Sequence, residues 1–150
     1  MDKLSSVRWK SFVLSDIFTI SSGKRLTKAD MKVGKRPFIG ATDSNNGITV
    51  DTTNESLDKL VLGVNYNGSV VETFFHPYEC IFSDDVKRLH LKNGITSYHV
   101  MLFLKTMIIQ QKVKFEYGYK FNEKRMQRQK ILLPVTEDNS PDWQFMEEYM

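Results

Sequence analysis

The sequence predicts an α+β domain that is rich in strands, with one buried central helix and the start of a C-terminal linker helix. Three observations support this fold class. Asn67-Gly68 stands between two apolar stretches, residues 97–113 are crowded with apolar side chains, and residues 130–134 read Lys-Ile-Leu-Leu-Pro. The first is a hairpin signal, the second indicates a helix that is buried on most of its faces, and the third is typical of a closing strand.

The opening third of the chain carries a mixed signal and then a strand signal. Residues 9–20 place an apolar side chain at every second or third position, which is too irregular to distinguish a short helix from a strand. Residues 35–41 predict a short strand. Residues 45–47, Asn-Asn-Gly, predict a tight turn before a strand at residues 48–50, because these residue types tolerate positive φ.

A hairpin follows. Residues 60–66 and 69–75 flank Asn67-Gly68, and a type I′ turn requires two residues at positive φ, as this dipeptide provides. Residues 79–83 and 86–91 then predict two further strands around a corner made of two aspartates.

The last part of the chain predicts two helices and a strand. Residues 97–113 are apolar on nearly all helical faces, so this helix is expected inside the core. Residues 130–134 form the final strand. A last helix is expected to begin at Pro141 with Ser140 as its N-cap, because serine accepts hydrogen bonds from free helical amides and proline suits the first helical position.

Composition places the chain among soluble globular proteins. At 150 residues, 41% hydrophobic and 26% charged, it is long enough for one domain. A single cysteine, Cys80, excludes an internal disulfide and a cysteine-rich metal site, and it fits a reducing cytoplasm. The N-terminus lacks an apolar signal core, and the longest apolar run is interrupted by Lys105, so we expect a cytoplasmic protein without membrane contact.

The charge distribution predicts a polyanionic partner. The net charge is only +3, but residues 23–35 hold five bases against one acid, and residues 112–130 mix bases with aromatic side chains. Residues 43–85 hold eight acids and one base, so the charge is strongly sided. Phosphates and bases favour such a mixture of cations and rings, and we therefore interpret the chain as a DNA-binding module.

The second basic stretch supplies most of the candidate DNA contacts. Its cations are expected to neutralise phosphates: Lys120, Lys124, Arg125 and Arg128. Its polar and aromatic side chains are expected to reach bases: Tyr117, Tyr119 and Asn122. A solvated face beside aromatic core residues explains the same pattern, although Arg125 and Arg128 share one helical face at their spacing of three.

Two further segments supply the remaining DNA candidates. Lys24, Arg25 and Lys28 can hold phosphates, although the spacing of a P-loop is missing and nucleotide hydrolysis is unsupported. The polar turn residues can read base edges: Thr42, Asp43, Ser44, Asn45 and Asn46. Any turn favours these short polar side chains, so a purely structural role stays open.

Two rival functions belong to other classes. A small magnesium-dependent nuclease would use Asp85 and Lys87, although surface acids at a strand corner explain these residues equally well. The three histidines show no metal-ligand spacing, and no methyltransferase signature is present. The other rival is a protein-interaction domain whose basic segments meet an acidic partner.

Read from end to end, the sequence resembles the target recognition domain of bacterial type I restriction-modification specificity subunits and of related fused methyltransferase-nuclease systems. The order and spacing of short motifs carry the resemblance. They are the Trp, Leu and Asp of residues 9–18, Ser-Gly-Lys at 22–24, Arg-Pro-Phe-Ile-Gly-Ala at 36–41, Gly-Ser-Val at 68–70, Asp-Asp-Val at 84–86, the helix opening at 98–104 and Ile-Leu-Leu-Pro at 131–134.

The resemblance implies that residues 1–136 form the DNA target recognition domain and residues 137–150 begin a partner-facing linker helix. The domain would read double-stranded DNA for a separate DNA adenine methyltransferase (modification) subunit and a restriction subunit, without being an enzyme. It would need no cofactor, since S-adenosylmethionine and ATP would belong to the partners. Family members usually carry two recognition domains, so a homodimer or a second recognition half is expected. Apolar residues of the last helix are the expected partner contacts: Trp143, Phe145, Met146 and Tyr149.

Overall fold

The computed structural model describes residues 3–23, 36–40, 45–53, 57–65, 72–110 and 123–150. The chain is an α+β fold that is rich in strands, as the sequence predicts. In order, the elements are η1 (Lys3–Ser6), β1 (Arg8–Val13), α1 (Leu14–Ile17), β2 (Phe18–Ser22), β3 (Arg36–Ile39), η3 (Asn45–Gly47), β4 (Ile48–Thr53), β5 (Val61–Asn65), β6 (Thr73–His76), β7 (Ile81–Phe82), β8 (Val86–Leu91), α2 (Tyr98–Ile109), α4 (Glu123–Arg128), β9 (Lys130–Val135) and α5 (Trp143–Tyr149).

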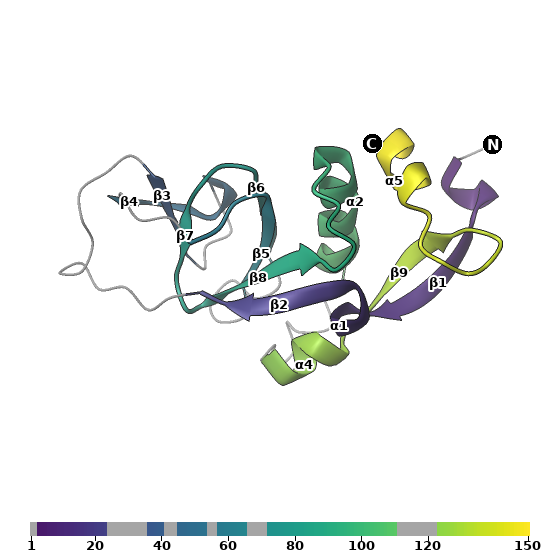
Figure 1. The fold of residues 1–150 in the computed structure, drawn as a ribbon, viewed down its shortest axis with the longest axis horizontal. Helices are drawn as coiled ribbons and strands as arrows, with labels where there is room; N and C mark the ends of the chain where they lie inside the picture. The colour runs from purple at the N-terminus through teal and green to yellow at the C-terminus, as the bar shows by residue number, and fades with distance from the viewer. Residues whose placement is uncertain (1–2, 24–35, 41–44, 54–56, 66–71, 111–122) are drawn as a thin grey trace.

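The described strands form three sheets that follow one another along the long axis (Figure 1). A three-stranded sheet of order β4-β3-β7 lies at one end, and a four-stranded sheet of order β2-β8-β5-β6 lies in the middle. The first and last strands, β1 and β9, pair antiparallel at the other end. Both chain ends lie beside this pair, next to α5 (Figure 1).

The opening segment is both helix and strand, which explains its irregular apolar spacing. Strand β1 leads into the single turn of α1, and β2 follows directly. Leu14 and Ile17 of α1 are buried, and Phe18 begins β2 with almost no exposed surface. Apolar residues are three positions apart in the turn of α1 and two positions apart in β2, so the segment as a whole has no single apolar period.

The predicted hairpin pairing is confirmed, but with a different register. Strands β5 and β6 pair antiparallel, with Val64 opposite Thr73. A two-residue turn at Asn67-Gly68 would instead place Val64 opposite Val71, so the observed register is offset by two residues. Because the offset is even, each side chain keeps its face of the sheet. The dipeptide itself lies outside the described residues.

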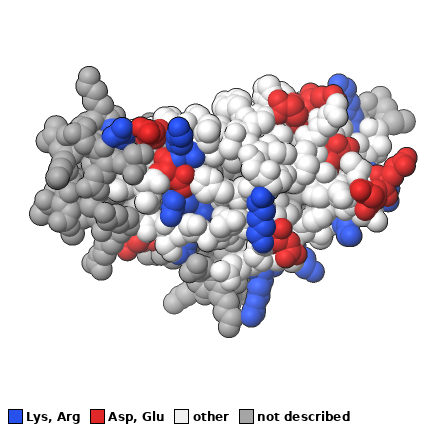
Figure 2. Space-filling model, viewed as in Figure 1, with Lys and Arg blue, Asp and Glu red and all other residues white. Residues whose placement is uncertain are grey.

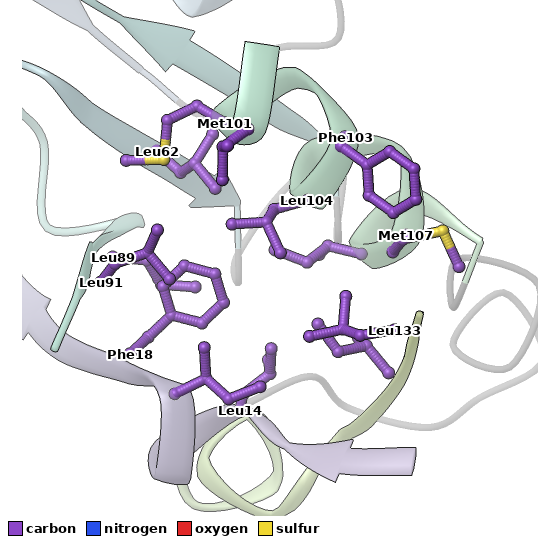
Figure 3. Close-up of a cluster of buried hydrophobic side chains, with 14 of the residues drawn as sticks. Leu14, Phe18, Leu62, Leu89, Leu91, Met101, Phe103, Leu104, Met107 and Leu133 are labelled. Atoms are coloured by element: carbon purple, nitrogen blue, oxygen red, sulfur yellow. The ribbon is translucent and has the colours of Figure 1, made fainter. Parts of the chain in front are cut away.

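Helix α2 is the buried helix that the sequence predicts. It ends at Ile109, four residues before the predicted end, and residues 111–113 lie outside the described part of the chain. Six of its side chains are buried: Val100, Met101, Phe103, Leu104, Met107 and Ile108. They belong to one core cluster with Leu14 and Phe18, Leu62 of β5, Leu89 and Leu91 of β8, and Leu133 of β9, and Figure 3 shows part of this cluster. Burying each such side chain contributes about 1.5–3 kcal/mol.

The C-terminal helix begins later than predicted. Asp142, and not Ser140, is the N-cap, because its side chain accepts a hydrogen bond from the backbone N–H of Phe145 at 3.0 Å. The helix starts at Trp143 and not at Pro141, whose backbone bridges to Val135. No helix in the described segments is long and apolar enough to cross a membrane.

Packing of α5 on α2 corrects the predicted partner surface. Met146 has no exposed surface and belongs to the same core as α2, so its side chain is not available to a partner. Trp143 and Phe145 are half-buried against that core. Tyr149 keeps 39% of its surface exposed, and of the four predicted partner contacts it is the most accessible. The linker helix thus begins as a part of the domain's own core.

Candidate nucleic-acid interface

Most of the predicted DNA contacts lie outside the described residues. These are Lys24, Arg25, Lys28, Thr42, Asp43, Ser44, Tyr117, Tyr119, Lys120 and Asn122. The backbone positions of Asn45, Lys124 and Arg125 are described, but their side chains are not. Asn46 and Arg128 are described with their side chains. Arg128 is exposed, whereas the side chain of Asn46 is hydrogen-bonded inside the molecule.

Helix α4 carries the last part of the second basic stretch. Met126 is fully buried, and the backbone N–H of Leu14 in α1 donates to the carbonyl of Gln129 at 2.8 Å. Helix α4 therefore packs beneath α1, as Figure 1 shows. At 3.6 residues per turn, position 128 lies about 200° around the helix from the buried Met126. Arg128 is exposed there, as a phosphate contact requires.

Asn46 has a structural role, which corrects its prediction as a base contact. Its φ of 54° and the φ of 78° at Gly47 confirm the predicted tight turn. The side-chain Nδ2 donates to the carbonyl of Phe75 at 3.0 Å and to the hydroxyl of Tyr78 at 2.9 Å. Both amide protons are thus engaged inside the molecule, and the side chain offers no donor to a base edge.

Tyr78 connects Asn46 to a buried histidine that sequence reasoning did not single out. Its hydroxyl lies 2.9 Å from Nδ1 of His76 and also accepts the hydrogen bond from Asn46. Nε2 of His76 has no hydrogen-bond partner among the described residues. Burial, and secondly the charge of Lys105, lowers the pKa of His76 to about 3, so the ring is neutral.

A second polar cluster joins strand β8 of the four-stranded sheet to Asp58, which precedes β5. Asp58 Oδ2 accepts hydrogen bonds from Arg88 at 2.8 Å and from Nε2 of His90 at 2.6 Å. Arg88 also donates from Nε to the carbonyl of Ser22 at 3.0 Å. The charge of Arg88 is therefore balanced inside the molecule, and its guanidinium is committed to structure.

The nuclease alternative gains no support from the described residues. Lys87 is buried in β8, and its Nζ donates to Ser22 Oγ at 2.8 Å. Asp84 and Asp85 form the turn before β8, as predicted for a strand corner. In the described segments, no three His, Cys, Asp or Glu side chains gather closely enough to hold a metal ion.

Gly23 anchors the start of the first basic segment. A Cβ added to Gly23 would lie 1.8 Å from the carbonyl oxygen of Ser83, which excludes any other residue without a backbone shift. The backbone N–H of Ser83 in turn donates to the carbonyl of Ile39 at 2.8 Å. Gly23, the last described residue before Lys24, therefore lies beside the corner that follows β7.

Charge on the described surface is mixed. On the face shown in Figure 2, the coloured Lys and Arg side chains stand among Asp and Glu side chains and do not gather into one patch. One example is the exposed pair of Arg36 and Glu79, whose charged groups lie 2.9 Å apart. Most cations of the two predicted basic stretches lie outside the described residues, so their contact with DNA stays a prediction.

Comparison with known proteins gives a consistent result. A family described as "Type I restriction modification DNA specificity domain" matches residues 6–150. A curated protein of Heyndrickxia coagulans, "Type II restriction enzyme BgcI specificity subunit S.BcgI", is 62% identical over 149 residues. That alignment covers 98% of this chain but 44% of the relative, so the chain spans less than half of that protein.

Two solved structures share the fold. The S subunit of a type I restriction-modification system from M. genitalium superposes with a TM-score of 0.70 at 19% identity, over 97% of this chain and 38% of that one. The HsdS subunit from Thermoanaerobacter tengcongensis gives a TM-score of 0.67 at 12% identity, over 94% of this chain and 36% of that one.

Proposed function

Because this chain belongs to the family of type I restriction modification DNA specificity domains, we propose that it binds double-stranded DNA in a sequence-specific manner. It would confer target specificity on separate modification and restriction subunits. The observation that carries this proposal is the family match over residues 6–150, together with 62% identity to a curated specificity subunit. The function follows from the family, since the fold alone is compatible with many functions.

The proposed mechanism divides phosphate contacts from base contacts. Lysines and arginines of the two basic stretches set the register on the phosphates, and polar side chains near the turns read base edges. Helix α4 supports this division, because Arg128 is exposed on it while Met126 is buried on the opposite side. Asn46 is left out of the base contacts, since its amide holds the turn.

The chain itself would perform no chemistry. We propose that a DNA adenine methyltransferase subunit binds S-adenosylmethionine and that a restriction subunit uses ATP, while this domain binds neither. The proposal places the protein in the cytoplasm with its DNA substrate. Of the predicted partner contacts, the packing of α5 leaves Tyr149 as the most accessible side chain.

A selection experiment tests this function directly. The purified chain should enrich one base sequence from a pool of randomised duplexes. Fluorescence anisotropy should then show affinity for that sequence at least 1,000-fold above that for unrelated DNA, as is typical of specific binders. Enrichment of no sequence, with equal affinity for all duplexes, would contradict the proposal. Absence of binding even at low salt would favour the protein-interaction domain, and cleavage of duplex DNA with magnesium would favour the nuclease.

A matched pair of triple variants tests the proposed surface. Alanine at Lys124, Arg125 and Arg128 should weaken DNA binding and reduce its salt dependence, because three cations leave the phosphate-facing helix. Alanine at Lys3, Lys10 and Lys92, which are exposed elsewhere, removes the same charge and should have a much smaller effect. Equal effects of the two variants would mean that net charge, and not the surface of α4, governs binding.

A further inference from the structure

The hydroxyl of Tyr78 is the meeting point of two side chains from different sheets. It accepts a hydrogen bond from the amide of Asn46, in the turn between β3 and β4, and it lies 2.9 Å from Nδ1 of the buried His76 in β6. The ring of Tyr78 meets the imidazole edge to face at 5.6 Å. Tyr78 is half-buried, and it packs on a core cluster that contains Ile39 and Phe82. A single hydroxyl therefore connects a strand of the four-stranded sheet to a turn of the three-stranded sheet.

The two residues that follow Tyr78 hold its backbone in place. The carboxylate of Glu79 accepts two hydrogen bonds from the guanidinium of Arg36 in β3, at 3.1 and 2.9 Å. The backbone N–H of the buried Cys80 donates to the carbonyl of Asp58 at 3.1 Å, and its carbonyl accepts from the N–H of the same residue at 3.2 Å. The exposed ion pair contributes little by itself, but the buried backbone bridge restricts where Tyr78 can lie.

The loop that Tyr78 holds is closed at its base. The backbone N–H of Gly40, directly after β3, donates to the carbonyl of Gly47 at 2.9 Å. Asn46 has a φ of 54°, and its amide donates both to Tyr78 and to a carbonyl of β6 at 3.0 Å. Residues 41–46 therefore connect two backbone positions that are held together, and the last residue of this loop is anchored to the neighbouring sheet.

We propose that Tyr78 is a positioning residue for DNA recognition, which acts through Asn46 and not by touching DNA. The inference rests on the proposed function and on the predicted base contacts Thr42, Asp43 and Ser44, which precede the anchored Asn46 in the same loop. A base edge offers its donors and acceptors at fixed positions, and hydrogen bonds weaken steeply when they are misaligned. Side chains that read bases therefore require a fixed backbone, which a hydrogen bond to a second sheet provides.

The two kinds of DNA contact give a positioning residue its own signature. Phosphate contacts depend on charge and set the salt dependence of binding. Loss of the hydrogen bond between Tyr78 and Asn46 removes no cation, so the salt slope should stay the same. Loss of base positioning should lower the affinity for the preferred sequence and leave the affinity for unrelated DNA almost unchanged. A residue that only stabilises the fold would lower the fraction of active protein without changing the base preference of the folded molecules.

Amide hydrogen exchange tests the positioning step without DNA. Tyr78→Phe keeps the ring and removes the hydroxyl, so the amide of Asn46 loses one acceptor. Exchange of the Gly40 amide, which closes the loop, should become about 5-fold faster or more, as the loss of one hydrogen bond implies. Tyr149→Phe is the matched control, because it removes the hydroxyl of a tyrosine on α5, at the other end of the molecule (Figure 1). Unchanged exchange at Gly40 in Tyr78→Phe would overturn the proposal.

Fluorescence anisotropy titrations test the recognition step, with the selected sequence and its single-base-pair variants. The wild type should discriminate against a wrong base pair by about 10-fold or more, and Tyr78→Phe should reduce this to about 3-fold or less at the base pairs that the loop reads. Asn46→Gly allows the positive φ, and it should lose discrimination at the same base pairs. The double variant should be no worse than Asn46→Gly, because both changes remove the same hydrogen bond. Asn46→Gly also provides the test if Tyr78→Phe does not fold.

The outcomes separate this inference from the proposed function. A wild-type chain that reads a sequence, with full discrimination by Tyr78→Phe and Asn46→Gly, would overturn the inference and leave the proposed function standing. A wild-type chain that enriches no sequence would overturn both. A lower active fraction with unchanged discrimination would assign Tyr78 to stability alone. A reduced salt slope in Tyr78→Phe would mean that it acts through phosphate contacts, and it would equally contradict the proposal.

Discussion

The side-chain amide of Asn46 donates a hydrogen bond to the hydroxyl of Tyr78 at 2.9 Å. Asn46 lies in the turn between β3 and β4 of the three-stranded sheet, and Tyr78 follows β6 of the four-stranded sheet. The same amide also donates to the carbonyl of Phe75 in β6 at 3.0 Å. One side chain therefore joins two sheets, and it does so from a residue whose φ is positive. This contact fixes the turn that follows the predicted base contacts Thr42, Asp43 and Ser44.

Replacing Asn46 should separate the hydrogen-bond effect from the backbone effect. Asn46→Gly removes the two hydrogen bonds and should lower the free energy of unfolding by about 1–2 kcal/mol. Asn46→Ala also places a Cβ at φ 54°, which should cost about 1 kcal/mol more. Urea denaturation of the three proteins measures both differences. If alanine were no worse than glycine, the left-handed conformation would not contribute to this cost.

The buried His76 predicts acid sensitivity of the fold. Burial and Lys105 lower its pKa from 6.5 to about 3 in the folded protein. Between these values the unfolded chain binds one more proton, so the free energy of unfolding should fall as the pH drops below 6.5. The contribution approaches about 1.4 kcal/mol per pH unit. His76→Gln should lose this part of the slope when unfolding is measured in urea from pH 4.5 to 7.5.

The exposed His99 offers a matched control for this pH dependence. His99 contacts Glu147 at the surface of the molecule at 3.3 Å. His99→Gln removes a histidine without touching the buried network, so it should keep the part of the slope that His76 contributes. A His76→Gln variant whose slope equals that of His99→Gln would show that His76 is not the residue responsible.

Gly23 should tolerate substitution far less well than Gly94. An alanine Cβ at position 23 would meet the backbone carbonyl of Ser83 at 1.8 Å, and backbone cannot rotate away as a side chain can. We expect Gly23→Ala to lower the free energy of unfolding by about 2–4 kcal/mol. Gly94 has a φ of 80° but open space around it, so Gly94→Ala should cost only about 1–2 kcal/mol. Thermal or urea denaturation compares the two, and equal losses would exclude the steric explanation.

Local sequence signals predicted the elements better than the contacts between them. The antiparallel pairing of β5 with β6, the buried helix α2 and the turn at Asn46 follow from residue types within a few positions, and all three are confirmed, although the register of the pairing differs from the predicted one. The pairing of β1 with β9 was not predictable, because it joins residues more than a hundred positions apart. Asn46 shows a second limit: an amide suits a base edge and a backbone carbonyl equally, and only the fold decides between them.

The start of α5 illustrates the same limit at short range. Ser140 and Asp142 are both favoured N-cap types, and the local pattern cannot choose between them. The backbone decides, because the carbonyl of Ser140 accepts from Thr136 at 2.9 Å and the N–H of Asp142 donates to Pro134 at 2.8 Å. These bonds hold the chain in a turn after β9, so the helix can begin only at Trp143.

The corrected N-cap gives a simple stability prediction. Asp142→Ala should lower the free energy of unfolding by about 1 kcal/mol, because the N–H of Phe145 loses its acceptor. Ser140→Ala should change it by less than about 0.5 kcal/mol, since the exposed Ser140 does not cap the helix. Urea denaturation distinguishes the two residues. A larger loss for Ser140→Ala would restore the N-cap that the sequence predicted.

Arg128 provides the sharpest single-residue test of DNA contact, because it is exposed on α4 and its side chain is described. If it reads a guanine, Arg128→Ala should weaken binding by about 1–3 kcal/mol and relax specificity at one base pair. If it contacts a phosphate, the variant should mainly lower the salt slope by about one. Arg8→Ala is the control, because the guanidinium of Arg8 donates to the carbonyls of Thr136 and Glu137 at 2.8 and 3.2 Å. Fluorescence anisotropy titrations between 50 and 200 mM salt measure DNA binding by both variants. If Arg128→Ala and Arg8→Ala both bound DNA like the wild type, the proposed role of α4 in the interface would be wrong.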